Sequence, residues 1–170
     1  KHPFIPDRMF DSIHEITAEF LISCGIRAVV LDIDNTLVTY GMAKPTPEVL
    51  SWIEGLRTGG LSVAIASNNH RERVDEFNAT LGREAYFHSA KPFGVTFRRV
   101  MKGWGLPREQ VAVLGDQLLT DALGGKHLGL RVIIVPPIRD KKTAFVRFKR
   151  WLERPYMRAF YKKQNEEENK

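Results

Sequence analysis

The sequence predicts an α/β protein built on a doubly wound parallel sheet, and three observations carry this prediction. Short apolar runs at residues 28–31, 61–66 and 111–114 have the length and composition of buried strands. Each run ends in small or acidic polar residues, and segments with helical periodicity separate the runs. Strands that alternate with helices along the chain call for a parallel sheet covered by helices on both faces.

The order of the predicted elements follows from the apolar patterns and from the residues at their ends. Pro47 suits the first turn of a helix, and Gly59-Gly60 suits its end. Gly82 ends the next helical pattern in the same way. We therefore expect five strands in alternation with helices: an opening helix over residues 7–23, strands over 28–31, 61–66 and 111–114, helices over 46–57, 71–81 and 118–128, a short strand before residue 91, and a last strand over 131–135.

A cluster of polar residues directly follows the first apolar run. The segment Asp32-Ile33-Asp34-Asn35-Thr36 stands at the predicted carboxyl end of that strand, where open parallel sheets bind ligands. Two neighbouring carboxylates are costly to bury unless a cation or a reacting group compensates them, so the cluster favours chemistry over packing. The alternative is a helix N-cap, a role that Asp, Asn and Thr all fill, although one cap needs only one such side chain.

Two later strands and one loop supply further polar groups. The second apolar run ends in Ser67-Asn68-Asn69, whose short side chains suit a phosphate oxygen. The third run ends in Gly115-Asp116, with Asp121 shortly after it, and Lys91 lies in the loop between these two runs. The carboxyl ends of parallel strands meet at one edge of a sheet, so we expect these groups to share a site with the Asp32 cluster.

Each of these residues also has an ordinary structural interpretation. Ser67 alone suits the cap of the next helix, and most lysines, such as Lys91, are simply solvated. Asp116 and Asp121 suit the cap of the helix over 118–128. The coincidence of all four with the Asp32 cluster favours the functional interpretation.

Hydrolysis of a phosphate monoester needs a nucleophile, neutralisation of charge and a proton for the leaving group, and the cluster offers all three. Asp32 would attack phosphorus and form an aspartyl-phosphate. Asp34 would protonate the leaving oxygen and then activate water. The Asp32 and Asp116 carboxylates would hold a hard divalent cation, Mg²⁺. The oxygens of the transferred phosphoryl group would be bound by the remaining polar residues, Ser67, Asn68 and Lys91.

In this order, the motifs resemble those of the haloacid dehalogenase (HAD) superfamily. The resemblance covers residues 4–137 and rests on four phrases: Asp32-Ile33-Asp34-Asn35-Thr36, Ser67-Asn68-Asn69, Ala90-Lys91-Pro92 and Gly115-Asp116-Gln117-Leu118-Leu119-Thr120-Asp121. More narrowly, the chain resembles the YqeG family of HAD subfamily IIIA phosphatases, which is related to phosphatidylglycerophosphate phosphatases of mitochondria and plastids. The resemblance implies a HAD-like, Rossmannoid fold.

The resemblance also implies two supporting roles. The Asp34 backbone carbonyl joins the metal ligands, and Asp121 orients Lys91 or a metal-bound water. We also expect Thr36 to support the site without binding the metal or the phosphoryl group itself.

Two spacings indicate that the site has no cap domain. The interval from Thr36 to Ser67 has room for one loop and one helix, and the interval from Ser67 to Lys91 for one helix and a short strand. HAD relatives that act on small metabolites often insert a cap domain in one of these intervals. We therefore expect a capless site, which tends to act on large or surface-bound phosphates, with residues 39–45 as the main specificity loop.

Composition agrees with one compact domain. The chain has 170 residues and 43% hydrophobic content, enough to bury a full core. Its single cysteine, Cys24, excludes an internal disulfide and suits a reducing compartment, so we expect a cytoplasmic protein. No apolar run approaches the roughly 18 residues of a membrane span. The chain begins with Lys1 rather than Met, which is compatible with a native segment before it.

Charge is concentrated near the C-terminus. Residues 1–138 carry 15 basic and 15 acidic side chains, whereas residues 139–163 carry 10 and 2, a net charge of +8. Aromatic residues such as Phe145, Phe148 and Trp151 recur there at helical spacing. We therefore expect a phosphatase domain over 1–138, a basic amphipathic helical segment over 139–163, and a disordered tail over 164–170.

The basic segment has three interpretations. Its aromatic face packs on the domain as an ordinary terminal helix, or it makes peripheral contact with an anionic membrane, or its basic residues bind RNA phosphates. Packing and contact with the inner face of a membrane are both favoured over nucleic acid, which we do not expect as a partner.

Two functions of different class follow. The first is an Mg²⁺-dependent phosphomonoester hydrolase that acts on phosphatidylglycerophosphate or another large anionic phosphate, including a phospholipid headgroup. The alternative is a non-catalytic adaptor that uses the fold to bind nucleic acid or a protein partner. Asp34 discriminates between them, because a pure binding protein does not need a general acid.

Overall fold

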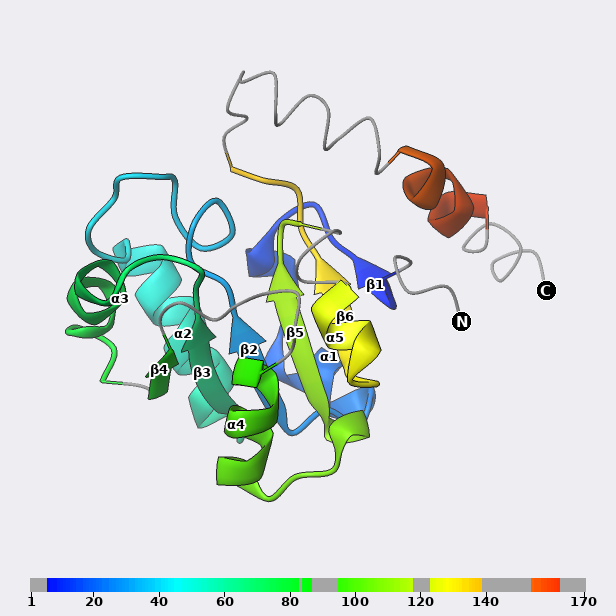
Figure 1. Ribbon diagram of the computed structural model, residues 1–170, viewed down its shortest axis with the longest axis horizontal. Helices are drawn as coiled ribbons and strands as arrows, with labels where there is room; N and C mark the ends of the chain where they lie inside the picture. Colours follow the sequence, from blue (N-terminus) through cyan, green and yellow to red (C-terminus); the bar gives the residue numbers. More distant parts are fainter. Residues whose placement is uncertain (1–5, 83, 87–94, 118–122, 139–153, 163–170) are drawn as a thin grey trace.

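The computed structural model describes residues 6–82, 84–86, 95–117, 123–138 and 154–162. Its centre is a six-stranded sheet in the order β1-β6-β5-β2-β3-β4, in which neighbouring strands run parallel (Figure 1). The strands are β1 (Arg8–Met9), β2 (Ala28–Leu31), β3 (Ser62–Ala66), β4 (Glu84–Tyr86), β5 (Val111–Gly115) and β6 (Arg131–Ile134). The sheet confirms the predicted α/β fold and adds β1 to the five strands expected.

Helices cover both faces of the sheet. On one face lie α1 (Ala18–Ser23), α2 (Pro47–Thr58) and α3 (Arg71–Asn78), over a buried layer that includes Val29 and Leu31 of β2. On the other face lie α4 (Val95–Trp104) and α5 (Leu123–His127), over a layer that includes Val30. Alternate residues of β2 therefore enter opposite apolar layers, as expected for a central parallel strand. Two short 3₁₀ helices, η1 (Ile13–Glu15) and η2 (Arg108–Gln110), precede α1 and β5.

The predicted opening helix over residues 7–23 is wrong, because β1, η1 and α1 occupy that segment. The Asp7 N–H donates to the Val132 carbonyl oxygen (2.8 Å), and the Asp7 carboxylate accepts the Val132 N–H (2.7 Å). The same carboxylate lies 2.6 Å from Lys126 Nζ. These interactions bind the start of the domain to the edge of β6. The backbone groups of this first segment are therefore satisfied by strand pairing and not by a helix.

Two hydroxyl caps divide the remainder of that segment. The Ser12 hydroxyl accepts the His14 N–H, and the Thr17 hydroxyl accepts the Phe20 N–H. Each cap satisfies an amide at a helix start, so η1 and α1 begin separately.

The other predicted elements agree with the structure in position. α2 is capped by the Thr46 hydroxyl and ends before Gly59-Gly60, as expected. α3 ends earlier than residue 81, and Gly82 follows it with a φ of +57°, a left-handed conformation that glycine adopts readily. α5 falls within the helix expected over 118–128, whose first part, 118–122, lies outside the described residues.

The intervals between the motifs hold no cap domain where the structure describes them. The residues from Thr36 to Ser67 are all described, and they form a loop, α2 and β3. From Ser67 to residue 86, the described residues form α3 and β4. The site edge of the sheet is therefore left without an inserted domain in this part of the chain.

Residues 154–162 are the described part of the basic segment over 139–163, and their packing bears on its three interpretations. They form a helix (Figure 1). Its Met157 packs against Val132 and Ile134 of β6, and its Phe160 is 7% exposed. For this part, the structure supports packing on the domain. The rest of the segment over 139–163 and the tail over 164–170 lie outside the described residues. Within the described ranges, no helix has the length and apolar character needed to cross a bilayer.

Candidate active site

The loop after β2 lies at the centre of the sheet's carboxyl edge. β2 has β5 on one side and β3 on the other, so the segments that follow these three strands meet there. The Asp32 N–H donates to the Leu114 carbonyl oxygen of β5 (3.0 Å), which continues the strand pairing past the end of β2. Asp32 and Asp34 are each only 8% exposed. Both carboxylates are therefore nearly buried at the edge where a ligand is expected.

A tight turn holds this loop in place. The Leu37 N–H donates to the Ile33 carbonyl oxygen (2.9 Å), and the Asn35 N–H donates to the Val38 carbonyl oxygen (2.7 Å). Asn35 has a φ of +67°, a left-handed conformation that Asn tolerates better than most residues. Asn35 therefore has a backbone role that the motif alone did not reveal.

The Thr36 hydroxyl lies between two carboxylates. Its oxygen is 3.4 Å from Asp32 Oδ2 and 3.3 Å from Asp116 Oδ1. A hydroxyl has one proton and donates to one acceptor at a time. Other groups must therefore neutralise most of the negative charge of the two carboxylates. The arrangement brings Asp32 and Asp116 to one side of the loop.

The oxygen atoms gathered at Thr36 suit a magnesium ion. Mg²⁺ is bound through one or two carboxylates and keeps several waters, and two carboxylates converge here. The described residues contain no group of three or more His, Cys, Asp or Glu side chains that could hold a metal ion. A cation at this edge would thus be held by Asp32 and Asp116 with water and backbone oxygen. The Asp34 backbone carbonyl stays the predicted further ligand.

Ser67 and Asn68 follow β3, on the other side of β2. Ser67 is 2% exposed, and its hydroxyl accepts the Asn69 N–H (3.1 Å). The cap role considered for Ser67 is not observed, because the N-cap residue of α3 is His70. Asn68 is exposed. Both residues lie at the same edge as Asp32, and their contacts with a phosphoryl group stay predictions.

Asp34 has two partners that sequence reasoning missed. Asn69 Nδ2 donates to Asp34 Oδ2 (3.1 Å), and Arg73 Nη2 donates to Asp34 Oδ1 (3.2 Å). The Arg73 and Asp34 side chains are 15% and 12% exposed. One feature of the sequence could have indicated the Arg73 contact. Arg73 lies in the first turn of α3, where the helix dipole favours acidic residues. A cation at that position is unfavourable unless an anion lies beside it.

The structure brings most of the predicted site residues to one edge of the sheet. Lys91 and Asp121 fall in segments 87–94 and 118–122, outside the described residues, so their roles stay predictions. The residues that do meet at this edge are Asp32, Asp34, Thr36, Ser67, Asn68 and Asp116.

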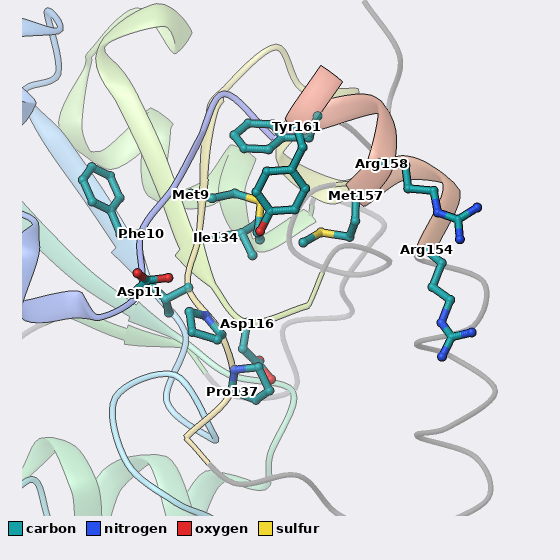
Figure 2. A pocket seen from close by; sticks show the side chains of 13 residues that line it. Met9, Phe10, Asp11, Asp116, Ile134, Pro137, Arg154, Met157, Arg158 and Tyr161 are labelled. Atoms are coloured by element: carbon teal, nitrogen blue, oxygen red, sulfur yellow. The ribbon is translucent and has the colours of Figure 1, made fainter. Parts of the chain in front are cut away.

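A cavity of about 760 Å³ includes Asp116 in its lining (Figure 2). Its walls include residues of β1, β6 and the helix over 154–162, which are far apart in the chain, so no local sequence pattern indicated the cavity. Asp11, Arg154 and Arg158 are its charged members besides Asp116. The other lining residues are apolar or aromatic, namely Met9, Phe10, Ile134, Val135, Pro136, Pro137, Met157, Phe160 and Tyr161.

Solved structures of other proteins share this fold. CbbY from Rhodobacter sphaeroides, in complex with phosphate, has a TM-score of 0.54 and 14% identity, over 71% of this chain and 90% of that chain. D,D-heptose 1.7-bisphosphate phosphatase from B. bronchiseptica, complexed with magnesium and phosphate, has a TM-score of 0.51 and 15% identity, over 64% and 80% of the two chains. At these identities the likeness concerns the fold alone.

Comparison of the sequence with those of other proteins identifies a relative and a family. The Bacillus subtilis (strain 168) protein named "Probable phosphatase YqeG" is 36% identical over 160 residues, which are 94% of this chain and 93% of that protein. This agrees with the predicted YqeG resemblance and enzyme class. A family model described as haloacid dehalogenase-like hydrolase matches residues 11–135, the range that contains every predicted site residue. The chain therefore belongs to the haloacid dehalogenase-like hydrolase family.

Proposed function

We propose that this protein is an Mg²⁺-dependent phosphomonoester hydrolase that works through an aspartyl-phosphate on Asp32. The observation that carries the proposal is the convergence of the Asp32 and Asp116 carboxylates on the Thr36 hydroxyl. Family membership supports a hydrolase, and a relative at 36% identity is named a probable phosphatase.

The chain's own residues account for both chemical steps. An Asp32 oxygen forms a bond to phosphorus while the bond from phosphorus to the leaving oxygen breaks, and Asp34 gives its proton to that oxygen to release an alcohol. Asp34 then takes a proton from water while the water oxygen attacks phosphorus, which releases phosphate and restores the Asp32 carboxylate. Asp32 and Asp116 would hold a magnesium ion, which would supply neutralisation of negative charge at the site.

Three further residues bind the phosphoryl oxygens in this proposal. Ser67 and Asn68 offer O–H and N–H donors from the loop after β3, and the Lys91 ammonium offers positive charge. Preorganised donors of this kind act most strongly in a site that excludes water, and Ser67 is almost completely buried.

The substrate we propose is a phosphate on a large amphipathic molecule, with phosphatidylglycerophosphate as the candidate suggested by the family resemblance. Two features support this class. The site lacks a cap over the described intervals, so a bulky or surface-bound group can approach it. The cavity that includes Asp116 combines apolar and aromatic side chains with two cationic residues, Arg154 and Arg158. Such a lining suits an apolar group attached to an anionic headgroup.

The alternative of a non-catalytic adaptor receives less support. Asn69 and Arg73 each hold one oxygen of the Asp34 carboxylate, and this gives Asp34 the fixed orientation that a general acid needs.

A phosphatase screen tests the proposal. We would compare phosphatidylglycerophosphate in mixed micelles with soluble sugar phosphates and nucleotides, each with Mg²⁺ and with chelator, and with Asp32→Asn as the blank. Release of phosphate that needs both Mg²⁺ and Asp32 supports the reaction, and a preference for the micellar substrate supports the substrate class. If phosphate release from every substrate is the same in Asp32→Asn as in the wild type, the proposed reaction is wrong.

A further inference from the structure

We propose that Arg73 is a positioning residue, which holds the Asp34 carboxylate in the orientation that proton transfer requires and ties it to the loop over residues 39–45. The inference rests on the proposed function, because Arg73 acts through the general acid of that reaction. It adds to the site a residue that lies outside the four motifs.

The geometry of Arg73 supports this role directly. Its guanidinium reaches two different segments, since Nη2 donates to Asp34 Oδ1 (3.2 Å) and Nη1 donates to the Ala43 carbonyl oxygen (3.3 Å). The guanidinium carbon also lies 5.5 Å from the centre of the Phe77 ring, on the same helix. Phe77 is fully buried, so the guanidinium stands over a fixed surface. These contacts leave the side chain little freedom to move away from Asp34.

Arg73 and Asn69 together hold both oxygens of the carboxylate. Asn69 Nδ2 donates to Oδ2, while Arg73 donates to Oδ1. A carboxylate on a single rotatable stem turns about that stem unless each oxygen has its own partner. Two donors from the loop and helix that follow β3 therefore fix a side chain that belongs to the loop after β2. A small misplacement of a catalytic group costs up to about 100-fold in rate, so this fixing has catalytic value.

The neighbouring ion pair on α3 shows what an ordinary pair looks like. Arg71 and Asp75 are also 3.2 Å apart, but their side chains are 69% and 59% exposed and they lie one turn apart on one helix. Exposed pairs of that kind contribute little to stability. The Arg73–Asp34 pair is largely buried and joins two segments of the site. Arg71 is therefore a matched control for Arg73.

The contact with Ala43 links the general acid to the loop expected to set specificity. One guanidinium bonds to both, so a change in the position of residues 39–45 changes the support of Asp34. The loop thereby takes part in the orientation of Asp34. The described intervals contain no cap domain that could do this instead.

The test uses two substrates that differ in their need for a general acid. Phenyl phosphate has a weakly acidic leaving group that needs a proton, whereas 2,4-dinitrophenyl phosphate has an acidic leaving group that departs without one. We would measure kcat/KM on both for the wild type, Asp34→Asn, Arg73→Met, Arg73→Lys and Arg71→Met. Methionine keeps an unbranched stem over Phe77 but has no N–H donor, so it changes the contact with Asp34 more than the packing.

The expected result is a selective loss. Arg73→Met should lower kcat/KM for phenyl phosphate by roughly 10–100-fold and that for 2,4-dinitrophenyl phosphate by less than about threefold. Arg73→Lys keeps the positive charge and N–H donors but not the planar guanidinium that reaches both Asp34 and Ala43, so it should recover part of the loss, and Arg71→Met should match the wild type. Addition of Arg73→Met to Asp34→Asn should cause no further loss, because residues that act as one unit are not additive. Hydrogen exchange of the amides in residues 39–45 should rise in Arg73→Met and not in Arg71→Met.

Other results overturn the inference and separate it from the proposed function. An equal loss on both substrates, no loss, or an additive loss in the double variant would mean that Arg73 does not act through Asp34. If Arg73→Met does not fold, Arg73→Lys makes the same comparison with a smaller expected effect. If Asp34→Asn itself shows no selective loss, the general acid of the proposed function is wrong. A selective loss in Asp34→Asn without one in the Arg73 variants defeats only the inference made here.

Discussion

The Thr36 hydroxyl oxygen lies 3.3 Å from Asp116 Oδ1, although 80 residues separate the two in the chain. The contact joins the loop after β2 to the end of β5 and sets Asp116 beside Asp32, whose Oδ2 is 3.4 Å from the same hydroxyl. Two carboxylates this close repel each other unless a cation neutralises them. The Asp32–Asp116 pair is therefore the part of the site that we expect a bound metal ion to stabilise most.

We expect activity to vanish in chelator and to return with Mg²⁺. Asp116→Ala removes one of two hard oxygen ligands, so the Mg²⁺ concentration for half-maximal activity should rise by roughly tenfold or more. Titration of activity with MgCl₂ after treatment with EDTA measures this. Asp75→Ala removes an exposed carboxylate of α3 and serves as the control. Unchanged activity in chelator would contradict the metal site.

Asp32→Asn should abolish turnover while the fold stays intact. Asparagine keeps the size of the side chain and removes the nucleophilic oxygen, so the covalent route is lost. Acid-quenched reactions of the wild type should contain a phosphorylated protein that the variant does not form. Circular dichroism checks the fold. Residual activity within tenfold of the wild type would exclude Asp32 as the nucleophile.

The sequence predicted where the candidate residues lie in the fold wherever they follow directly from strand ends, while their functional roles stay predictions. A parallel sheet brings the ends of neighbouring strands together, so Asp32, Ser67 and Asp116 could be placed at one edge from the order of the apolar runs alone. Asp34 and Thr36 follow because they lie in the same short turn as Asp32.

Features that depend on tertiary contacts could not be predicted in this way. β1 has only two residues, and its place in the sheet depends on the bonds of Asp7 with Val132 and Lys126, which are distant in the chain. Local helical periodicity therefore gave the wrong element there. The pairing of Arg73 with Asp34 depends likewise on how α3 packs beside β2, and a cation in a helix first turn does not say which anion it meets.

The close packing of Gly59, at the end of α2, allows a prediction about stability that needs no assumption about function. A Cβ atom at Gly59 would lie 2.3 Å from the Ala18 Cβ of α1, a distance that two carbon atoms cannot keep. Gly59→Ala should therefore lower the free energy of unfolding by about 1–3 kcal/mol through overpacking. Gly55, in the same helix, has open space at its Cβ position, so Gly55→Ala should raise it by about 0.5–1 kcal/mol.

Urea unfolding of both glycine variants measures the difference. Ala18→Gly combined with Gly59→Ala should recover part of the lost stability, because it removes the atom that clashes. A Gly59→Ala protein as stable as Gly55→Ala would show that α1 and α2 pack less closely than the structure indicates.

The last prediction concerns the segment over residues 139–163, whose net charge of +8 contrasts with the neutral domain. We expect it to bind the protein reversibly to anionic bilayers. Each basic residue near such a surface contributes about 1 kcal/mol, and salt screens the attraction, so binding should be strong only at low ionic strength. Deletion is a poor test, because Met157 and Phe160 pack on the domain and their loss would disturb it.

Charge removal tests the segment without that disturbance. Lys141→Gln, Lys142→Gln and Lys149→Gln together should cost about 3 kcal/mol of binding, roughly a hundredfold, in sedimentation with phosphatidylglycerol liposomes at low salt. The control removes the same charge from exposed positions of α4 by Arg98→Gln, Arg99→Gln and Lys102→Gln. Equal losses in the two variants would mean that net charge, and not this segment, attracts the bilayer. If the wild type stays in the supernatant at low salt, the segment does not bind membranes, and the case for a lipid substrate then depends on the uncapped site and the cavity beside Asp116.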